Sequence, residues 1–405
     1  MDVREIRREF PFFCQEDSPL IYFDNGATTQ KPQAVIDRLV QYYAKENANI
    51  HRGSYPLSSR ADHMYEHARA SVAKWLDAAE SAEIVFTRGS TEAVNLAASA
   101  VGETWLKPGD NVVVTELEHS SNYFPWKHQC EKYGAEFRVA KADTDGSLTA
   151  EAVTSLVDGR TRLAAVTAMS NVTGFRPDIR RITADAHEKG AFVFVDASQE
   201  IVHHKVSVRE LDCDFLCFSS HKLYGPMGVG VLYGKRRWLE ELNPYLYGGD
   251  MIEKGDGGSI RCKTDPGKYE AGTQNLAGAL GLEAALSFLE SHNFPELVRY
   301  EQSLGEYLRK RLKEIPGIRL PGPEEASTVL TFELDGFGAY DVGVLLGNNN
   351  IAARCGAHCA YPLMKRMGKE STCRVSLAFY NTFEEVDRLA ECLKKMGGMR
   401  GRRIV

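Results

Sequence analysis

Short apolar runs and stretches with helical spacing alternate along roughly the first 290 residues. The runs cover residues 84–87, 111–116, 163–171, 191–198, 214–220 and 228–234. They are continuously apolar, which is typical of strands buried on both faces of a mostly parallel sheet. Because segments with the 3.6-residue spacing of a helix separate many of these runs, the pattern predicts an α/β fold.

The pattern changes near residue 277. Two long helical stretches, 277–292 and 295–315, follow one another, and short strands and helices in mixed order come after them. This order is typical of a smaller α+β unit. We therefore predict a large domain over 16–290 and a small domain made of 1–15 and 291–405, a division that the length of 405 residues allows.

Composition narrows the classes of function. Lys and Arg total 49 against 55 Asp and Glu, a net charge of -6. The sequence therefore lacks the excess of positive charge that indicates binding to nucleic acid or to an anionic membrane. No stretch reaches the roughly 18 apolar residues of a membrane helix. The charged start MDVREIRREF lacks the core of a signal peptide. Nine scattered cysteines without a CxxC pair predict free thiols in a reducing cytoplasm and no metal site of the zinc-ribbon type.

Lys222 closes the apolar run at 214–220 and is followed by the glycine-rich segment LYGPMGVG. A lysine in such a place lies near the floor of a cleft, where desolvation lowers its pKa and favours imine formation. A lysine after a strand is usually a surface charge, so Lys222 alone is a weak signal. Asp196 ends a neighbouring run, and a carboxylate there would keep the pyridine nitrogen of pyridoxal phosphate protonated. Its alternative role is a turn or a cap.

Other polar residues at predicted strand ends fit the same cofactor. Ser90 and Thr91 open a helix and could cradle an anion, or serve only as a helix cap. Hydroxyl and imidazole groups next to Lys222 also suit a phosphate. Further residues at the predicted strand ends could contact the flat ring of the cofactor. The phosphate candidates beside the lysine are Ser219 and His221, and the ring candidates are His119, Asn171 and Gln199.

Two residues of the C-terminal unit add chemistry. Cys359, in RCGAHCA, has cationic neighbours that favour the thiolate, although most cysteines are inert and packed. Cys355 lies four residues earlier and is its rival or partner. Arg374 stands inside an apolar strand and needs an anion, either a substrate carboxylate or an internal ion pair.

These features resemble the cysteine desulfurase and selenocysteine lyase family, within the class V aminotransferase group of fold-type I pyridoxal-phosphate enzymes. The resemblance runs nearly end to end and is most specific around Lys222. It rests on YFDNGATTQKP (22–32), NIHRGSYPLS (49–58), FTRGSTEAVNL (86–96), LEHSSNYFPW (117–126), VDASQ (195–199), DCDFLCFSSHKLYGPMGVGVLYG (212–234), YEAGTQN (269–275), RCGAHCA (354–360) and CRVSLAFYNTFEEVDRL (373–389).

The resemblance implies a role for each matching residue. Lys222 would form the Schiff base and move the α-proton, and Cys359 would take the substrate sulfur as a persulfide, releasing L-alanine from L-cysteine. Thr273 would reach the phosphate of a partner subunit, which implies a homodimer. The remaining roles are the pyridine nitrogen for Asp196, the ring oxygen for Gln199, ring stacking and proton shuttling for His119, the phosphate for Ser90, Thr91, Ser219 and His221, and the substrate for His51, Asn171 and Arg374.

The sequence departs from the family at three positions. Ala357 replaces a histidine that is usual in the short-loop, Suf-type branch, Cys355 is an extra thiol that could resolve a persulfide on Cys359, and Ser198 replaces a common alanine. A sulfur-acceptor protein and iron–sulfur cluster assembly are implied only by the resemblance.

Several other functions stay open at this point. One alternative is a selenocysteine lyase acting on L-selenocysteine. Another lyase, a transaminase or an epimerase of the same superfamily would not need Cys359. A noncatalytic sulfur carrier or scaffold would need no Lys222 or Asp196. A nucleotide-binding protein is disfavoured, because there is no GxxxxGK[ST] motif.

Overall fold

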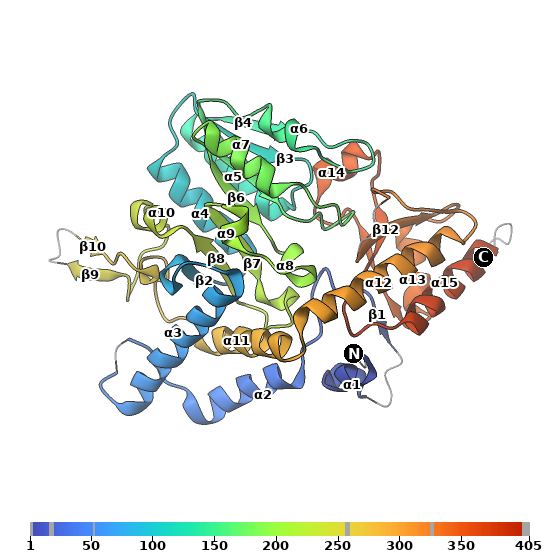
Figure 1. Cartoon of the computed structure of the whole chain (residues 1–405), viewed down its shortest axis with the longest axis horizontal. Helices are drawn as coiled ribbons and strands as arrows, with labels where there is room; N and C mark the ends of the chain where they lie inside the picture. The colour runs from blue at the N-terminus through green and yellow to red at the C-terminus, as the bar shows by residue number, and fades with distance from the viewer. Residues whose placement is uncertain (1–2, 16–19, 52, 256–259, 325–327, 399–405) are drawn as a thin grey trace.

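A seven-stranded sheet forms the centre of the larger part of the molecule (Figure 1). The computed structural model describes residues 3–15, 20–51, 53–255, 260–324 and 328–398. In spatial order the strands are β2 (Ile84–Thr87), β8 (Gly230–Gly234), β7 (Phe215–Ser219), β6 (Phe192–Asp196), β5 (Thr161–Thr167), β3 (Asn111–Thr115) and β4 (Glu136–Ala140). β8 runs antiparallel to both of its neighbours, and the other strands run parallel to one another, so the predicted α/β fold with a mostly parallel sheet is confirmed.

Helices cover both faces of this sheet, which explains why its strands are apolar throughout. Val112 and Val114 of β3 belong to the apolar layer beneath two helices, whereas Val113 belongs to the layer on the opposite face. The first layer is covered by α4 (Ser90–Thr104) and α5 (Ser120–Tyr133). The second is covered by α7 (Ile179–Glu188), α3 (Pro56–Leu76) and α11 (Leu276–Ser291).

Shorter helices complete the larger part of the chain. They are α2 (Gln33–Gln41), continued by a π-helical turn at Tyr42–Glu46, α6 (Ala150–Thr154), α8 (Glu200–His203), α9 (Val208–Leu211), α10 (Arg236–Glu241) and the 3-10 turns η3 (Ser81–Glu83), η4 (Ser220–Lys222) and η5 (Pro266–Lys268). A hairpin of β9 (Ile252–Gly255) and β10 (Ile260–Cys262) projects from this part (Figure 1).

The C-terminal unit has its own antiparallel sheet of four strands and its own apolar core, at the right of Figure 1. The strand order is β11 (Ile318–Arg319), β12 (Val329–Leu334), β15 (Thr372–Ser376) and β14 (Arg354–Gly356). Its helices are α12 (Phe294–Lys313), α13 (Ala339–Gly347), α14 (Tyr361–Arg366) and α15 (Phe383–Gly398). The early elements are α1 (Val3–Arg8) and η1 (Pro11–Phe13), and the ring centroid of Phe12 in η1 lies 5.8 Å from that of Tyr22.

The strand β1 (Ile21–Tyr22) pairs in parallel with β13 (Ile351–Ala352) of the C-terminal unit. Ile21 and Phe23 pack in the core of that unit. The division at residue 290 stays a prediction, and this pairing shows that residues 21–23 pack with the C-terminal unit although the predicted boundary assigns them to the large domain.

Two local features differ from what the sequence pattern predicts. The pattern predicts a helix over about 63–78, but α3 begins at Pro56, because proline suits the first helical turn. The strand β4 was missed because it lies at the sheet edge and is only partly buried, so its apolar run is short. Among the described residues, no helix combines the length and apolar character needed to cross a membrane.

Candidate active site

The carboxyl ends of the parallel strands open into a cavity of about 200 Å³, where ligands bind in sheets of this kind. Ten of the predicted site residues line this cavity. They are Ser90, Thr91, His119, Asn171, Asp196, Gln199, Ser219, His221, Lys222 and Arg374. They come from positions spread over nearly 300 residues of the sequence, so the fold itself brings them together.

Lys222 lies in η4, directly after β7. Burial lowers the pKa of its ammonium group to about 8, and the nearby carboxylate of Asp196 opposes the shift. The carbonyl of the preceding residue, His221, accepts hydrogen bonds from Thr29 N at 3.1 Å and from Lys31 Nζ at 2.8 Å. These bonds fix the backbone that carries Lys222, and the lowered pKa supplies a free amine near neutral pH.

Asp196 ends β6 and is buried. Its Oδ1 accepts the backbone N–H of Ser198 at 3.0 Å, which orients the carboxylate into the cavity. Gln199 donates from Nε2 to the carbonyl of Gly26 at 2.8 Å. Because a carbonyl only accepts, this bond fixes the amide and leaves Gln199 Oε1 as its acceptor end.

Three groups at the start of α4 form an anion cradle. Ser90 N donates to Ser219 Oγ at 2.8 Å, and Ser219 Oγ donates to Ser90 Oγ at 2.9 Å. Gly230 of β8 packs on this turn so closely that a Cβ there would lie 2.4 Å from the Cα of Gly89. The N-terminus of α4 and the hydroxyls of Ser90 and Ser219 suit a phosphate.

His119 caps α5 at the mouth of the cavity. Burial and, to a smaller extent, the charge of Lys222 lower the pKa of its imidazole to about 4, so the ring is neutral near pH 7. Its Nδ1 accepts the backbone N–H of Ser121 at 3.2 Å, which places the single proton on Nε2. Ser120 connects this helix start to the loop that carries Cys359.

Arg374 is buried and only partly paired, and the first position of β14, Arg354, also lines the cavity. The Arg374 guanidinium donates from Nη1 to the carbonyl of Asn171 at 2.9 Å and from Nη2 to Asp24 Oδ1 at 3.1 Å. Nε has no hydrogen-bond partner among the described residues. The ion pair with Asp24 accounts for one edge of the guanidinium, and two arginines facing one cavity favour an anionic ligand.

Cys359 is half-buried and does not line this cavity, although its neighbour His358 does. Both residues have positive φ angles, 55° for Cys359 and 52° for His358. The carbonyl of Cys359 accepts hydrogen bonds from Ser120 N at 2.7 Å and Ser120 Oγ at 2.8 Å. The loop is therefore attached to the residue that follows His119, at the rim of the site.

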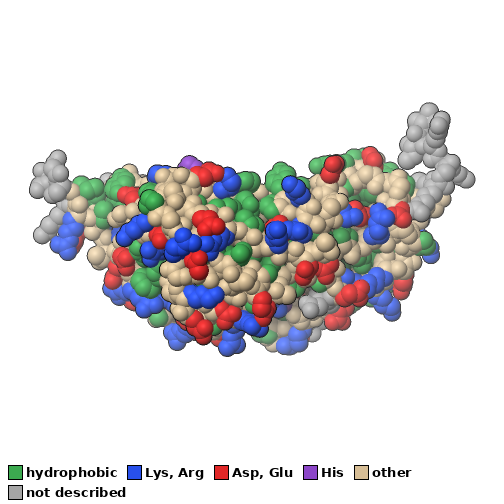
Figure 2. Space-filling view, turned by 90° about the horizontal axis from the view of Figure 1, so that it is seen from above, with side chains coloured by type: hydrophobic (Ala, Val, Ile, Leu, Met, Phe, Trp, Pro, Cys, Tyr) green, Lys and Arg blue, Asp and Glu red, His purple; other side chains and the backbone are tan. Residues whose placement is uncertain are grey.

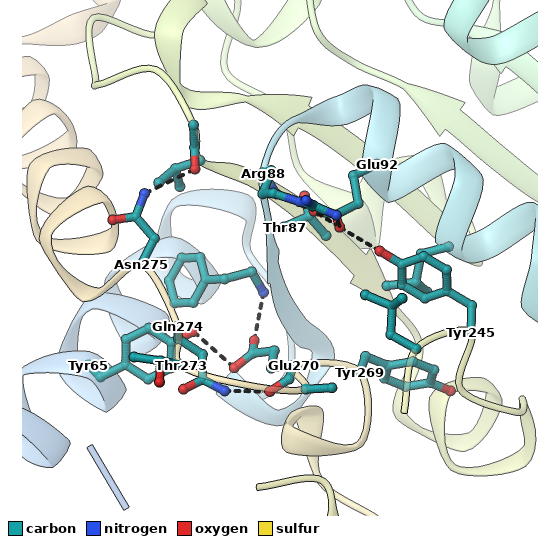
Figure 3. Close-up of a pocket in the computed structure, with 16 residues that line it drawn as sticks. Tyr65, Thr87, Arg88, Glu92, Tyr245, Tyr269, Glu270, Thr273, Gln274 and Asn275 are labelled. Carbon is teal, nitrogen blue, oxygen red and sulfur yellow. Dashed lines mark hydrogen bonds and ion pairs between the residues drawn. The ribbon is translucent and has the colours of Figure 1, made fainter. Parts of the chain in front are cut away.

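Thr273 lies in a different cavity, of about 520 Å³ (Figure 3). A third cavity, of about 500 Å³, shares Ser90 and Ser219 with the strand-end cavity and Tyr245 with the cavity of Thr273. The phosphate cradle thus opens onto the surface that contains Thr273. Figure 3 shows Thr273 beside Gln274 and Glu270.

His51 lies farther away, in a cavity of about 440 Å³, where its backbone N–H donates to Asp62 Oδ1 at 2.6 Å. Within one chain the structure does not bring Thr273 or His51 to Lys222, and their predicted roles stay predictions.

Sequence reasoning missed Glu118, which precedes His119 and is completely buried. Glu118 Oε1 accepts hydrogen bonds from Thr115 Oγ1 at 2.6 Å and Thr167 N at 3.0 Å, and Oε2 accepts one from Asn122 Nδ2 at 2.6 Å. Burial raises the pKa of this carboxyl to about 8. The sequence signal that could have identified Glu118 was its position next to the candidate residue His119. Its burial could not be predicted, because it depends on the packing of helix α5.

Pyridoxal phosphate fits this set of residues. Three buried polar atoms of the cavity lining lack partners among the described residues, namely Ser198 Oγ, Arg374 Nε and His358 Nδ1. The anion cradle, the carboxylate of Asp196 and the amine of Lys222 would hold the phosphate, the pyridine nitrogen and the aldehyde carbon. The described residues contain no group of three or more His, Cys, Asp or Glu side chains placed to hold a metal ion.

Comparison with known families decides the relationship. The family model described as aminotransferase class-V matches residues 21–389. The chain belongs to this family. It is also 44% identical over 405 residues to a cysteine desulfurase of Pectobacterium carotovorum, a match that covers 98% of this chain and 99% of the relative.

Solved structures of class-V relatives have the same fold. The crystal structure of the cysteine desulfurase CsdA from Escherichia coli superposes with a TM-score of 0.91 at 36% identity, over 98% of each chain. An apo cysteine desulfurase from Thermococcus onnurineus superposes with a TM-score of 0.93 at 33% identity, again over 98% of each chain. The predicted membership of the class-V group and the fold-type I architecture are confirmed.

Proposed function

We propose that this protein is a pyridoxal-phosphate-dependent cysteine desulfurase in which Lys222 holds the cofactor and Cys359 receives the sulfur of L-cysteine. The observation that carries the proposal is one cavity that joins a buried amine, Lys222, to the carboxylate of Asp196, an anion cradle and Arg374. The predicted activity and cofactor are confirmed by relatives named cysteine desulfurase that are 40–44% identical over nearly the whole chain.

Substrate binding follows from the charges in the cavity. The carboxylate of L-cysteine would take the free edge of Arg374, whose other edges are held by Asn171 and Asp24. Arg354 would add a second cation. A planar guanidinium matches a carboxylate with two parallel hydrogen bonds, so the orientation of the amino acid is fixed.

Proton movement is assigned to Lys222. Because burial lowers the pKa of its amine to about 8, the amine can accept the substrate α-proton near neutral pH. When bound, pyridoxal phosphate supplies an electron sink that makes this proton acidic, and Asp196 would keep its ring nitrogen protonated. His119, neutral with its proton on Nε2, can donate a hydrogen bond at the mouth of the cavity.

Sulfur transfer is assigned to Cys359. Its thiolate would form a bond to the substrate sulfur while the carbon–sulfur bond of the substrate breaks, and the electron pair would return to carbon. Protonation of that carbon gives L-alanine, and the sulfur remains as a persulfide on Cys359. The attachment of this loop to Ser120 supports the assignment, because it keeps Cys359 next to the His119 side of the site.

The proposal also covers the oligomeric state of the enzyme, its sulfur acceptor and its location in the cell. A homodimer would bring Thr273 of one subunit to the phosphate cradle of the other, which the continuous cavities between Thr273 and Ser90 support. The persulfide would pass to an acceptor protein, with iron–sulfur cluster assembly as its use. Nine free cysteines support a cytoplasmic location.

The test measures alanine and sulfide formed from L-cysteine by the cofactor-loaded enzyme, with Cys359→Ala compared with Cys392→Ala. We expect Cys359→Ala to abolish both products and the Cys392→Ala variant, changed at a site in the core of the C-terminal unit, to retain them. Products from Cys359→Ala at the wild-type rate would contradict the proposal. Cleavage of L-selenocysteine but not of L-cysteine by the wild-type enzyme would identify a selenocysteine lyase instead.

A further inference from the structure

Two thiols outside the active-site cavity lie in contact on neighbouring strands. Cys355 of β14 and Cys373 of β15 are directly paired in register, and their sulfur atoms are 3.4 Å apart. Residues in register in an antiparallel pair have Cα separations of about 4.5–5.5 Å, within the range that a disulfide spans. All nine cysteines are free thiols in this structure.

The pair faces away from the substrate. Successive side chains of a strand point to opposite faces, so the cavity-lining Arg354 and Arg374 direct their thiol neighbours to the far side of the sheet. There Cys373 Sγ lies 3.2 Å from the carbonyl oxygen of Ala339 in α13. Cys355 therefore contacts Cys373 on the face away from the cavity, whereas the sequence left open whether Cys355 is a rival or a partner of Cys359.

The sulfur of Cys355 packs against Gly343 of α13. A Cβ at that position would lie 2.6 Å from Cys355 Sγ, so only glycine accommodates the sulfur there. Cys355 is half-buried, whereas Cys373 has an exposed fraction of 1%. A hydrogen bond from the Cys373 thiol lowers the pKa of Cys355, which favours its thiolate. The accessible sulfur is thus the better nucleophile, and the buried one is placed to resolve.

We propose that Cys355 and Cys373 form a second thiol site, distinct from Cys359, that reacts with small organic disulfides to give a disulfide across β14 and β15. The Cys355 thiolate attacks one sulfur of the reagent RSSR and releases one RSH. The sulfur of Cys373 then displaces the second RS group. Two protein thiols are oxidised, RSSR is reduced to two RSH, and the two thiol protons leave with them.

The site connects to substrate binding through the strands. A disulfide between Cys355 and Cys373 would lock the separation and twist of β14 and β15 at this pair of residues. Arg354 and Arg374 are the adjacent residues on these strands, so the disulfide restricts how the two arginines can adjust to a substrate. We expect the oxidised enzyme to bind L-cysteine several-fold more weakly, a consequence that rests on the proposed function, whereas formation of the disulfide does not.

The test treats the cofactor-loaded wild-type protein with bis(2-hydroxyethyl) disulfide and maps its peptides by mass spectrometry. We expect a Cys355–Cys373 crosslink that a dithiol reductant removes. The variant Cys373→Ala should trap the reagent on Cys355 as a mixed disulfide, and the matched variant Cys392→Ala should still form the crosslink. Crosslinking of Cys355 to Cys359, or an unmodified Cys355 when Cys359 has reacted, would overturn the proposal.

A kinetic arm separates this site from the active-site thiol. Treated wild-type enzyme and treated Cys355→Ser enzyme lose equal activity to modification of Cys359. In addition, we expect the disulfide to raise KM for L-cysteine in the treated wild-type enzyme but not in the treated Cys355→Ser enzyme. An equal KM in both treated proteins, despite a mapped crosslink, would contradict the coupling to substrate binding but not the thiol site itself. Absence of turnover in the untreated protein would contradict only the proposed function.

Discussion

The floor and the rim of the candidate active site are built differently. The floor consists of Lys222, Asp196 and Arg374, which lie on or directly after strands and are largely buried. The rim consists of Cys359, Thr273 and His51, which lie in loops outside the floor cavity. The floor is complete within one chain, whereas the rim includes a loop at positive φ and, in the proposed homodimer, Thr273 of a second subunit.

This difference separates the two tasks of the enzyme. A buried floor shifts pKa values and holds charges in fixed directions, which the chemistry at the α-carbon requires. A half-buried rim leaves a sulfur atom accessible, which transfer to the proposed acceptor protein requires. The two regions also differ in charge. Figure 2 shows Lys and Arg interspersed with Asp and Glu over the face in view, whereas the cavity at the floor is lined by the cations Arg354, Arg374 and Lys222.

The largest expected effect is at the floor, with Lys222→Ala. Loss of the amine removes both the covalent attachment of the cofactor and the proton acceptor, so we expect alanine formation to fall by at least about 10³-fold. The visible absorption band of the attached cofactor should disappear as well. Lys141→Ala, at an exposed lysine, is the control and should leave both unchanged. A yellow, active Lys222→Ala enzyme would show that the floor is assigned to the wrong residue.

Next in size is Arg374→Lys. The ammonium keeps the charge but loses the planar fork, so we expect KM for L-cysteine to rise roughly 10–100-fold with a smaller change in kcat. Steady-state kinetics of alanine formation measure this effect. Arg319→Lys, at an arginine that is 62% exposed, should not change KM. An unchanged KM in Arg374→Lys would indicate that the pair with Asp24 is only structural.

At the rim, we expect Thr273→Val to weaken the retention of the cofactor, an effect smaller than those of the two substitutions at the floor. One hydrogen bond to a charged group contributes about 1.5–3 kcal/mol, so we expect pyridoxal phosphate to bind roughly 10–100-fold more weakly in the dimer. Dialysis followed by absorption measures the retained cofactor. Thr144→Val, at an exposed threonine, is the control. Equal retention in both variants would mean that the rim contributes nothing to the phosphate site.

The smallest effect concerns Glu118→Gln, behind the floor. The folded-state pKa of Glu118 is raised from 4.5 to about 8, so the folded protein binds more protons than the unfolded chain between these values. Stability from this group is therefore present below about pH 4.5 and is lost as the pH rises toward 8. We expect the urea midpoint of Glu118→Gln to decline less than that of the wild type over this interval. Parallel pH profiles would show that Glu118 ionises normally.

The same contrast explains what could be predicted from the sequence. Lys222 and Asp196 follow continuous apolar runs, and residues at the carboxyl ends of parallel strands meet at one edge, so the pattern alone brought them together. The contact of Cys355 with Cys373 depends on the register of β14 and β15, which no local pattern specifies, so the sequence indicated only that Cys355 is a rival or partner of Cys359. The burial of Glu118 likewise depends on long-range packing.

The pairing of β1 with β13 also has a consequence for biosynthesis. On the ribosome, residues 21–22 are made long before their partner residues 351–352. At about 5–20 residues per second, the strand β1 waits tens of seconds before its partner exists. Asp24 likewise cannot pair with Arg374 until that later segment has been made. The substrate-binding corner therefore forms only after the segment with Arg374 has been made, so nascent chains have a period in which the large sheet is formed but this corner is not.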